Sequence, residues 1–260
     1  MDLIIGHDGG FMSCSSLRLY YLVLFYNKYK QLPRLYDTTD FYTWYKNNTK
    51  EDITFHYFKH YNEIEEKINY IDNINYHECY QYKKYTTLDL KVLLPLIHKY
   101  FTPTDEIMNI KNTIECKYSL DYDNICVLFY RGNDKITEIS LPSFDEYILY
   151  ADEILKKQPN IKFLIQSDET NFINVMRLQY PTNHIVFNDE IRHIPRRNTT
   201  VDKIIFKEHN YTYSKKYLAI TLIMSKCKYI ICNSGNCAIW TVFYRQNTDN
   251  VIQLSAIDSL

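Results

Sequence analysis

Short apolar runs and amphipathic stretches alternate through the second half of the chain. The apolar runs predict strands at 125–130, 161–166, 184–187, 229–232 and 251–254, and the stretches between them predict helices at 144–157, 171–179, 216–225 and 237–245. Strands and helices that alternate at these spacings are typical of a parallel sheet with right-handed crossovers. The segment 188–213 is polar and predicts a long surface excursion before the later helices and strands.

The first half opens on a similar unit and then becomes irregular. Leu3–Ile5 predicts a short strand, 6–13 a loop, and the recurrence of apolar residues from Ser15 or Ser16 onward a long helix. Further helices are predicted at 40–47, 63–70 and 88–100, with another one opened by Pro103 and Asp105. We therefore expect an α/β fold, and the length of the chain allows one large domain or two small ones.

Glycine is rare and its positions are not scattered. The chain has only five glycines, Gly6, Gly9, Gly10, Gly132 and Gly235. They fall in three loops, each of which follows an apolar segment and precedes a predicted helix. Because glycine is unfavourable except where the backbone needs unusual angles or close approach, this placement predicts three ligand loops at the carboxyl ends of strands.

The middle loop carries the strongest chemical signal. The apolar run Ile125–Tyr130 is followed at once by Arg131, Gly132, Asn133, Asp134 and Lys135. Arginine offers a planar fork of donors to phosphate, lysine a point charge, and glycine lets the backbone come close. These residues predict a diphosphate-binding loop, with a solvated charged turn as the structural alternative. The first loop, with Gly9 and Gly10 before a helix, predicts either an anion or sugar-hydroxyl site or a purely structural turn.

Composition limits the classes of function. The 260 residues are 46% hydrophobic, and 30 basic side chains nearly balance 31 acidic ones, so general attraction to nucleic acid or anionic membrane is not expected. The 26 tyrosines are read as compositional bias. Seven cysteines without paired C-x-x-C spacing favour a reducing compartment and no zinc site. We expect a cytoplasmic protein without a signal peptide or membrane span.

Three motifs between residues 125 and 237 resemble the donor domain of the GDP-fucose-dependent fucosyltransferases of GT-B fold. The loop 131–135 is similar to their Arg-Arg-Thr-Asp-Lys, with Gly132 in place of the second arginine. Ser167, Asp168 and Glu169 stand where that family has a Thr-Asp-Asp-like strand end. The segment 227–237 resembles their late strand and phosphate loop, although 233–236 is not the usual Ser-Ser-Gln.

The resemblance implies two Rossmann-like domains with parallel sheets that face each other across a cleft. The unit 1–120 would then carry the acceptor and 121–260 the nucleotide sugar. The implied activity is metal-independent, inverting transfer of a sugar to a hydroxyl of a glycan or protein. The expected sugar is fucose, and the expected donor is GDP-fucose. No cofactor, metal or nucleic-acid partner is expected.

The expected site residues come from these three motifs and from the first glycine loop. The expected donor-binding residues are Arg131, Gly132, Asn133, Lys135, Ser167, Asp168, Glu169, Asn233, Ser234, Gly235, Asn236, Gly9 and Gly10. Arg131 and the amides of 234–236 would stabilise the leaving phosphate, and Asp168 or Glu169 would bind the nucleoside. The candidates for the general base are Asp8, Asp134 and Glu138. Together with Arg131, they make up the expected catalytic residues. For Asp134, an ion pair with Arg131 or Lys135 is the preferred alternative.

Two other functions remain open. A Rossmann-type methyltransferase or dehydrogenase is expected to carry a G-x-G-x-x-G or related loop in its first turn, and the glycines of 6–10 have the wrong spacing for it. A non-catalytic nucleotide-sugar-binding module of the same fold is the other alternative. His56, His60 and His77 do not form a spacing that favours a metal site.

Overall fold

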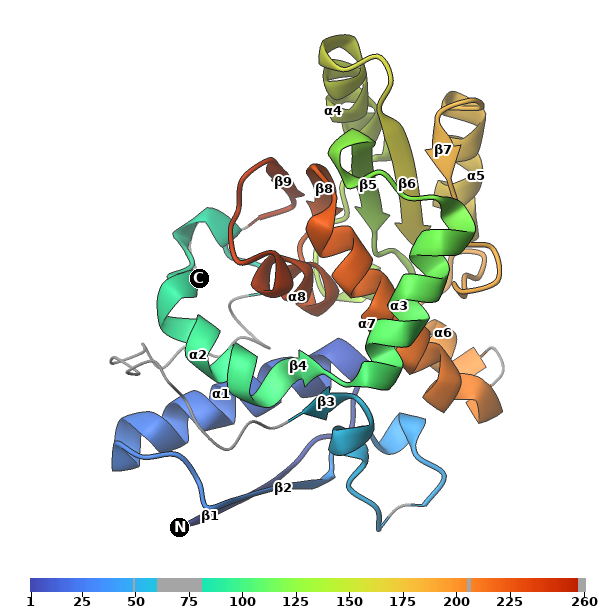
Figure 1. Ribbon diagram of the computed structural model, residues 1–260. Helices are drawn as coiled ribbons and strands as arrows, with labels where there is room; N and C mark the ends of the chain where they lie inside the picture. Colours follow the sequence, from blue (N-terminus) through green and yellow to red (C-terminus); the bar gives the residue numbers. More distant parts are fainter. Residues whose placement is uncertain (49, 60–80, 205–206, 257–260) are drawn as a thin grey trace.

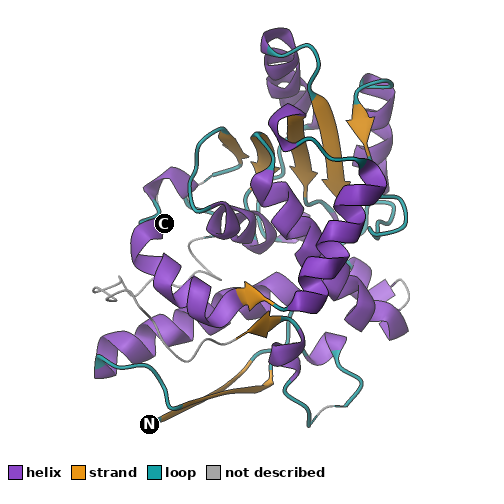
Figure 2. Ribbon diagram, in the orientation of Figure 1, coloured by secondary structure: helices purple, strands orange, loops and turns teal. Residues whose placement is uncertain are grey.

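The computed structural model describes residues 1–48, 50–59, 81–204 and 207–256 (Figure 1). The helix expected at 63–70 and the histidines at 60 and 77 lie outside the described residues. The architecture is α/β, with its largest sheet in the C-terminal half, as expected from the alternating pattern (Figure 2).

The C-terminal half is built on a five-stranded parallel sheet. Its strand order is β7-β6-β5-β8-β9. The strands are β5 (Ile125–Tyr130), β6 (Lys162–Ser167), β7 (His184–Ile185), β8 (Tyr229–Asn233) and β9 (Val251–Leu254). All pairings are parallel, and β5 is buried along its whole length. A central strand covered on both faces needs this continuous apolar sequence, which explains why the pattern predicted β5 correctly.

The helices connect the strands in two directions from β5. They are α4 (Phe144–Lys157), α5 (Thr170–Gln179), α6 (Val201–Ile204), α7 (Asn210–Lys226) and α8 (Asn236–Arg245). The chain runs from β5 outward to β7 and then returns to β8 on the other side of β5. Right-handed crossovers place the two sets of helices on opposite faces of such a sheet. The strand order therefore reverses between β5 and β8, where α/β folds open a ligand crevice.

The N-terminal half contains a smaller parallel pair. The strands β1 (Asp2–Gly6) and β2 (Leu35–Asp40) are parallel and are joined through α1 (Phe11–Tyr29). The short strands β3 (Phe58–Lys59) and β4 (Thr102–Pro103) pair antiparallel, and α2 (Leu90–Phe101) and α3 (Asp105–Tyr118) complete this half. Short 3-10 turns occupy Thr43–Tyr45, Ile53–His56, Tyr85–Thr87, Tyr122–Asn124, Asn133–Thr137 and Lys207–His209.

The two halves are packed together through their helices. The indole of Trp240 on α8 donates a hydrogen bond of 3.0 Å to Ser16 Oγ on α1, and its ring lies 4.7 Å from that of Phe101. α3 packs along α7, so the range 1–120 also contributes to the layer beside the C-terminal sheet (Figure 1). Nearly all buried apolar side chains of the described residues form one continuous cluster. This packing fixes the N-terminal loop relative to the edge of the large sheet, and the exact division at residue 120 stays a prediction.

Three predicted elements were placed wrongly. α1 begins at Phe11 rather than at Ser15 or Ser16, because Gly10 is its N-cap and the hydroxyl of Tyr45 accepts the Phe11 N–H at 2.8 Å. The helix expected at 40–47 is only the 3-10 turn at 43–45. α7 begins at Asn210, six residues before the predicted start, and takes over the end of the polar excursion.

Candidate functional site

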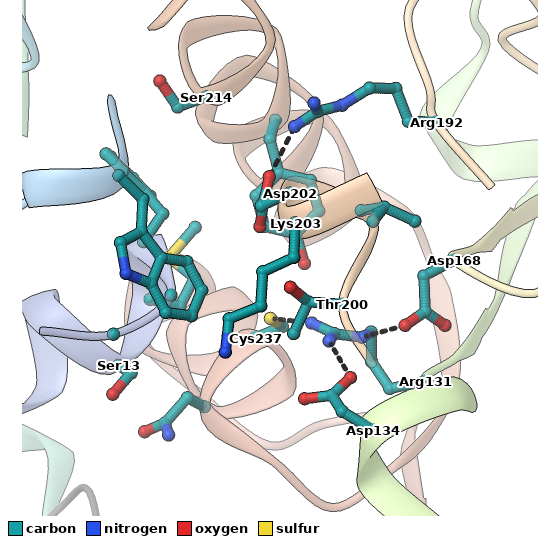
Figure 3. Close-up of a pocket in the computed structure, with 18 of the residues that line it drawn as sticks. Ser13, Arg131, Asp134, Asp168, Arg192, Thr200, Asp202, Lys203, Ser214 and Cys237 are labelled. Atoms are coloured by element: carbon teal, nitrogen blue, oxygen red, sulfur yellow. Dashed lines mark hydrogen bonds and ion pairs between the residues drawn. The ribbon is translucent and has the colours of Figure 1, made fainter. Parts of the chain in front are cut away.

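A cavity of about 430 Å³ lies between the β1–α1 loop and the carboxyl edge of the large sheet. Its volume falls within the usual range of small-molecule sites, roughly 300–1,000 Å³. The predicted site residues that line it are Asp8, Gly9, Gly10, Arg131, Asp134, Lys135, Glu138, Ser167, Asp168 and Asn236. The others, Gly132, Asn133, Glu169, Asn233, Ser234 and Gly235, belong to the loops at the same edge of the sheet or to the ends of its strands but do not line the cavity. Residues far apart in the sequence are therefore brought to one place (Figure 3).

Arg131 projects into this cavity from the end of β5. Its Nε donates to Asp168 Oδ2 at 3.0 Å, its Nη2 to Asp134 Oδ1 at 3.1 Å and its Nη1 to Cys237 Sγ at 2.9 Å. Burial alone would lower the pKa of the guanidinium, but the charges of Asp168 and Asp134 raise the pKa well above its ordinary value. Arg131 is thus a permanently charged, fixed donor, and Asp134 has the ion pair expected as its alternative role.

Asp168 and two asparagines hold the loop after β5 in place. The second oxygen of Asp168 accepts the Gly132 N–H at 2.9 Å, and its backbone carbonyl accepts from Asn133 Nδ2 at 2.6 Å. The amide of Asn233 pairs with both the N–H and the C=O of Arg131, at 2.8 and 2.9 Å. These contacts hold the loop in a defined conformation beyond the end of the strand. Both carboxylate oxygens of Asp168 bind protein groups.

The glycine at position 132 has a structural cause. A Cβ at Gly132 would lie 2.1 Å from Glu169 Oε2. Glu169 is fully buried and accepts from Arg196 Nε at 3.0 Å, and Arg196 also donates to the hydroxyl of Tyr130 at 3.1 Å. The space beside position 132 is therefore filled by the Glu169–Arg196 ion pair, which does not border the cavity.

The loop after β8 is closed by other parts of the chain. Its three successive N–H groups donate to Leu254 O, to Tyr85 Oη and to Gln81 Oε1, each at 3.1 Å. Gly235 has φ 154° and ψ 167°, a conformation that other residues rarely adopt, and so requires glycine. The amides expected at a leaving phosphate are all bound to protein acceptors in this structure.

Lys135 lies under the same closing segment. It is nearly buried, and its Nζ donates to Glu138 Oε2 at 2.5 Å and to Gln81 Oε1 at 3.2 Å. Glu138 also accepts a hydrogen bond from the hydroxyl of Tyr82. Lys135 and Glu138 therefore neutralise each other at the border of the cavity.

The opposite wall is the β1–α1 loop. Asp8 is exposed and accepts a hydrogen bond from the hydroxyl of Thr43 at 2.7 Å. The Nε2 of His7 lies 2.8 Å from Ser13 Oγ, and Gly9 makes room for the imidazole because a Cβ there would lie 2.4 Å from that nitrogen. Burial lowers the pKa of His7 below 6.5, against the charge of Asp8, so the ring is neutral at pH 7. This wall offers a carboxylate, a neutral imidazole and the N-terminus of α1.

Several lining residues were not predicted from the sequence. The polar excursion crosses the cavity and contributes Thr200, Asp202 and Lys203, while Gln166 contributes from inside β6. Gln166 Oε1 and Thr200 Oγ1 are buried and have no hydrogen-bond partner among the described residues. Gln166 was not recognised because it lies within a predicted strand. The excursion has no regular pattern from which its path could be predicted. Buried polar atoms of this kind commonly mark a water or ligand position.

The described ranges contain no group of three or more His, Cys, Asp or Glu side chains that could hold a metal ion. None of the helices in the described residues is long and apolar enough to cross a membrane.

Comparison with known proteins gives a weak fold-level match. No protein-family model matches the chain, and no curated protein matches it in sequence. Among solved structures, the chain is similar to the crystal structure of NodZ alpha-1,6-fucosyltransferase soaked with GDP-fucose, with a TM-score of 0.38 and 8% identity. The alignment covers 60% of this chain and 47% of the other, so the chain matches less than half of that protein's length.

Proposed function

We propose that the protein is a metal-independent glycosyltransferase that uses a nucleoside-diphosphate sugar. The observation that carries the proposal is Arg131, a fixed and permanently charged arginine at the end of the central strand. Arg131 lines the cavity at the point where the strand order reverses. This position is where α/β folds bind ligands. The loop it opens is also the motif that resembles the fucosyltransferases, so the proposed donor is GDP-fucose.

The chemistry requires stabilisation of negative charge. As the bond from the anomeric carbon to the donor breaks, charge develops on the leaving β-phosphate. A donor that is already held in place by Asp168 and Asp134 does not have to reorganise when that charge appears. Arg131 would therefore stabilise the departing diphosphate without a divalent ion, and the N-terminus of α1 adds positive potential from the opposite wall.

The attacking hydroxyl, on a glycan or protein, needs a proton acceptor. Of the three expected carboxylates, Asp134 is paired with Arg131, and Glu138 is paired with Lys135. Asp8 lies on the wall opposite Arg131, and its hydrogen-bond partner is the neutral hydroxyl of Thr43. We assign the general base to Asp8, because among the described residues its carboxylate forms no ion pair and it lines the cavity.

Calorimetric titration with GDP, UDP and dTDP, each in EDTA, tests the proposal, followed by transfer assays with the corresponding sugar nucleotides. GDP is expected to bind most tightly and to raise the melting temperature most, since a ligand selective for the folded state stabilises it by mass action. Tighter binding of UDP would change the donor but keep the reaction class. Absence of binding by all three, or binding only with manganese or magnesium, would contradict the proposal.

A further inference from the structure

Four cationic side chains line the cavity: Arg131 and Lys135 from the loop after β5, and Arg192 and Lys203 from the polar excursion. Lys203 on α6 extends into the cavity, and in Figure 3 its ammonium points toward Ser13 and the Arg131–Cys237 pair. The ammonium lies 4.8 Å from the ring centroid of Trp44, which lines the same cavity. Across residues 1–48, 50–59, 81–204 and 207–256, Lys203 forms no ion pair, whereas Arg131 has two carboxylates.

We propose that Lys203 and Thr200 complete the diphosphate site by binding the side of the phosphates that faces away from Arg131. This inference rests on the proposed function and names a part of the same site. Two independent observations support it: a cation without a carboxylate partner among the described residues, and the buried Thr200 Oγ1, which has no partner there and lines the cavity beside it. A phosphate oxygen would satisfy both groups.

The excursion is held over the cavity by a polar network. Asp202, next to Lys203, accepts from Arg192 Nη2 at 2.5 Å and from the hydroxyl of Tyr45 at 3.1 Å. Asn210 donates to the carbonyls of Trp44 and Asp202, at 3.1 and 3.0 Å. These bonds connect Asp202 to the N-terminal half and to Asn210 at the start of α7. They therefore hold the backbone that carries Lys203 in place.

The other arginine close to the loop after β5 does not line the cavity. Glu169 fills the space beside Gly132, and its partner Arg196 lines a separate groove. Lys203 brings to the cavity, from a different element, a positive charge that has no carboxylate partner among the described residues. A diphosphate would then lie between a planar arginine fork on the sheet side and a point charge on the excursion side.

The test is calorimetric binding of GDP, pyrophosphate and guanosine to the wild type, Lys203→Ala and Lys203→Arg. Loss of a charge-assisted hydrogen bond is expected to weaken GDP and pyrophosphate binding by about tenfold to a hundredfold. Guanosine binding should stay within about twofold, and Lys203→Arg should restore most of the affinity. Lys28→Ala is the matched control, because Lys28 is also exposed and lies 4.9 Å from an aromatic ring, that of Tyr29, outside the cavity.

Differential labelling gives a second readout that does not depend on turnover. An amine-reactive reagent should modify Lys203 in the free protein, and pyrophosphate should protect it while leaving Lys28 equally reactive. Lys203→Ala with unchanged GDP affinity, or Lys203 equally labelled with and without pyrophosphate, would overturn the inference and leave the role of Arg131 standing. A wild-type protein that binds neither GDP nor pyrophosphate would instead overturn the proposed function and this inference with it.

Discussion

The loops after β5 and β8 each contain a glycine and an asparagine and follow neighbouring strands of one sheet, but their donors bind different partners. After β5, Arg131 reaches into the cavity from a loop fixed by Asp168 and Asn233. After β8, three successive N–H groups already bind protein acceptors, two of them from the segment at Gln81 and Tyr85. The comparison shows that a loop at the carboxyl edge of a sheet can bind a ligand only where its N–H groups and side-chain donors are not already bound to other parts of the chain.

The first way to sharpen the comparison is to test the wall that faces the β5 loop. Asp8→Asn is expected to reduce kcat by about a hundredfold to ten-thousandfold, the usual contribution of a general base. The affinity for GDP should be unchanged, because the proposed role of Asp8 is to accept the proton of the attacking hydroxyl and not to bind the phosphates. Transfer kinetics with saturating donor measure the first effect and calorimetry the second. A kcat within about threefold of wild type would remove Asp8 from the mechanism.

The second prediction concerns the stability of the β5 loop. Arg131 lies between Asp168 and Asp134, and Asp168 is 6% exposed. Arg131→Ala should lower the free energy of unfolding by roughly 3–5 kcal/mol, since it leaves a buried carboxylate without its cation. Urea denaturation measures this loss. A much smaller loss, below about 1 kcal/mol, would show that the ion pairs do not hold the loop.

The third prediction addresses the β8 loop. Gln81→Ala removes the acceptor shared by the Asn236 N–H and Lys135 Nζ, and should cost about 1–3 kcal/mol of stability. If the loop only supports the fold, GDP affinity stays within about threefold of wild type. A large gain in GDP affinity would instead mean that Gln81 occupies a phosphate position, and both loops would be ligand loops.

The smallest expected effect is on acid stability. Burial lowers the pKa of His7 and of His193 below 6.5, so the folded state binds these protons more weakly than the unfolded chain does. Their contribution is fully present above about pH 6.5 and is lost as the pH falls below it. His193→Gln should reduce the loss of stability between pH 7.5 and 5.5, measured by urea denaturation. Equal losses in variant and wild type would contradict this assignment.

The sequence predicted the parts of the molecule that have a regular physical cause. β5, α4 and β9 occur at their predicted bounds, because buried parallel strands and amphipathic helices leave strong periodic patterns. The β5 loop was also located correctly by its glycine and charges. The partners of its residues could not be predicted, because Asp134 and Asp168 look identical in sequence whether they bind a ligand or an arginine of the protein.

The path of the polar excursion could not be predicted from the sequence. The segment 188–213 has no hydrophobic period, and the path of its described residues depends on long-range bonds such as the one from Tyr45 to Asp202. Such contacts join residues more than a hundred positions apart and leave no local signal. Lys203 and Thr200 were therefore missed, although they line the cavity beside Arg131.

The central claim is that the guanidinium fork of Arg131 binds the diphosphate of the donor. The most direct measurement is calorimetric titration of Arg131→Lys with GDP and with guanosine, in EDTA. Lysine keeps a cation beside Asp168, so the protein should stay folded, but a point charge cannot reproduce the fork. The account predicts GDP binding weakened by about tenfold or more with guanosine binding unchanged. GDP binding within about twofold of wild type would contradict it.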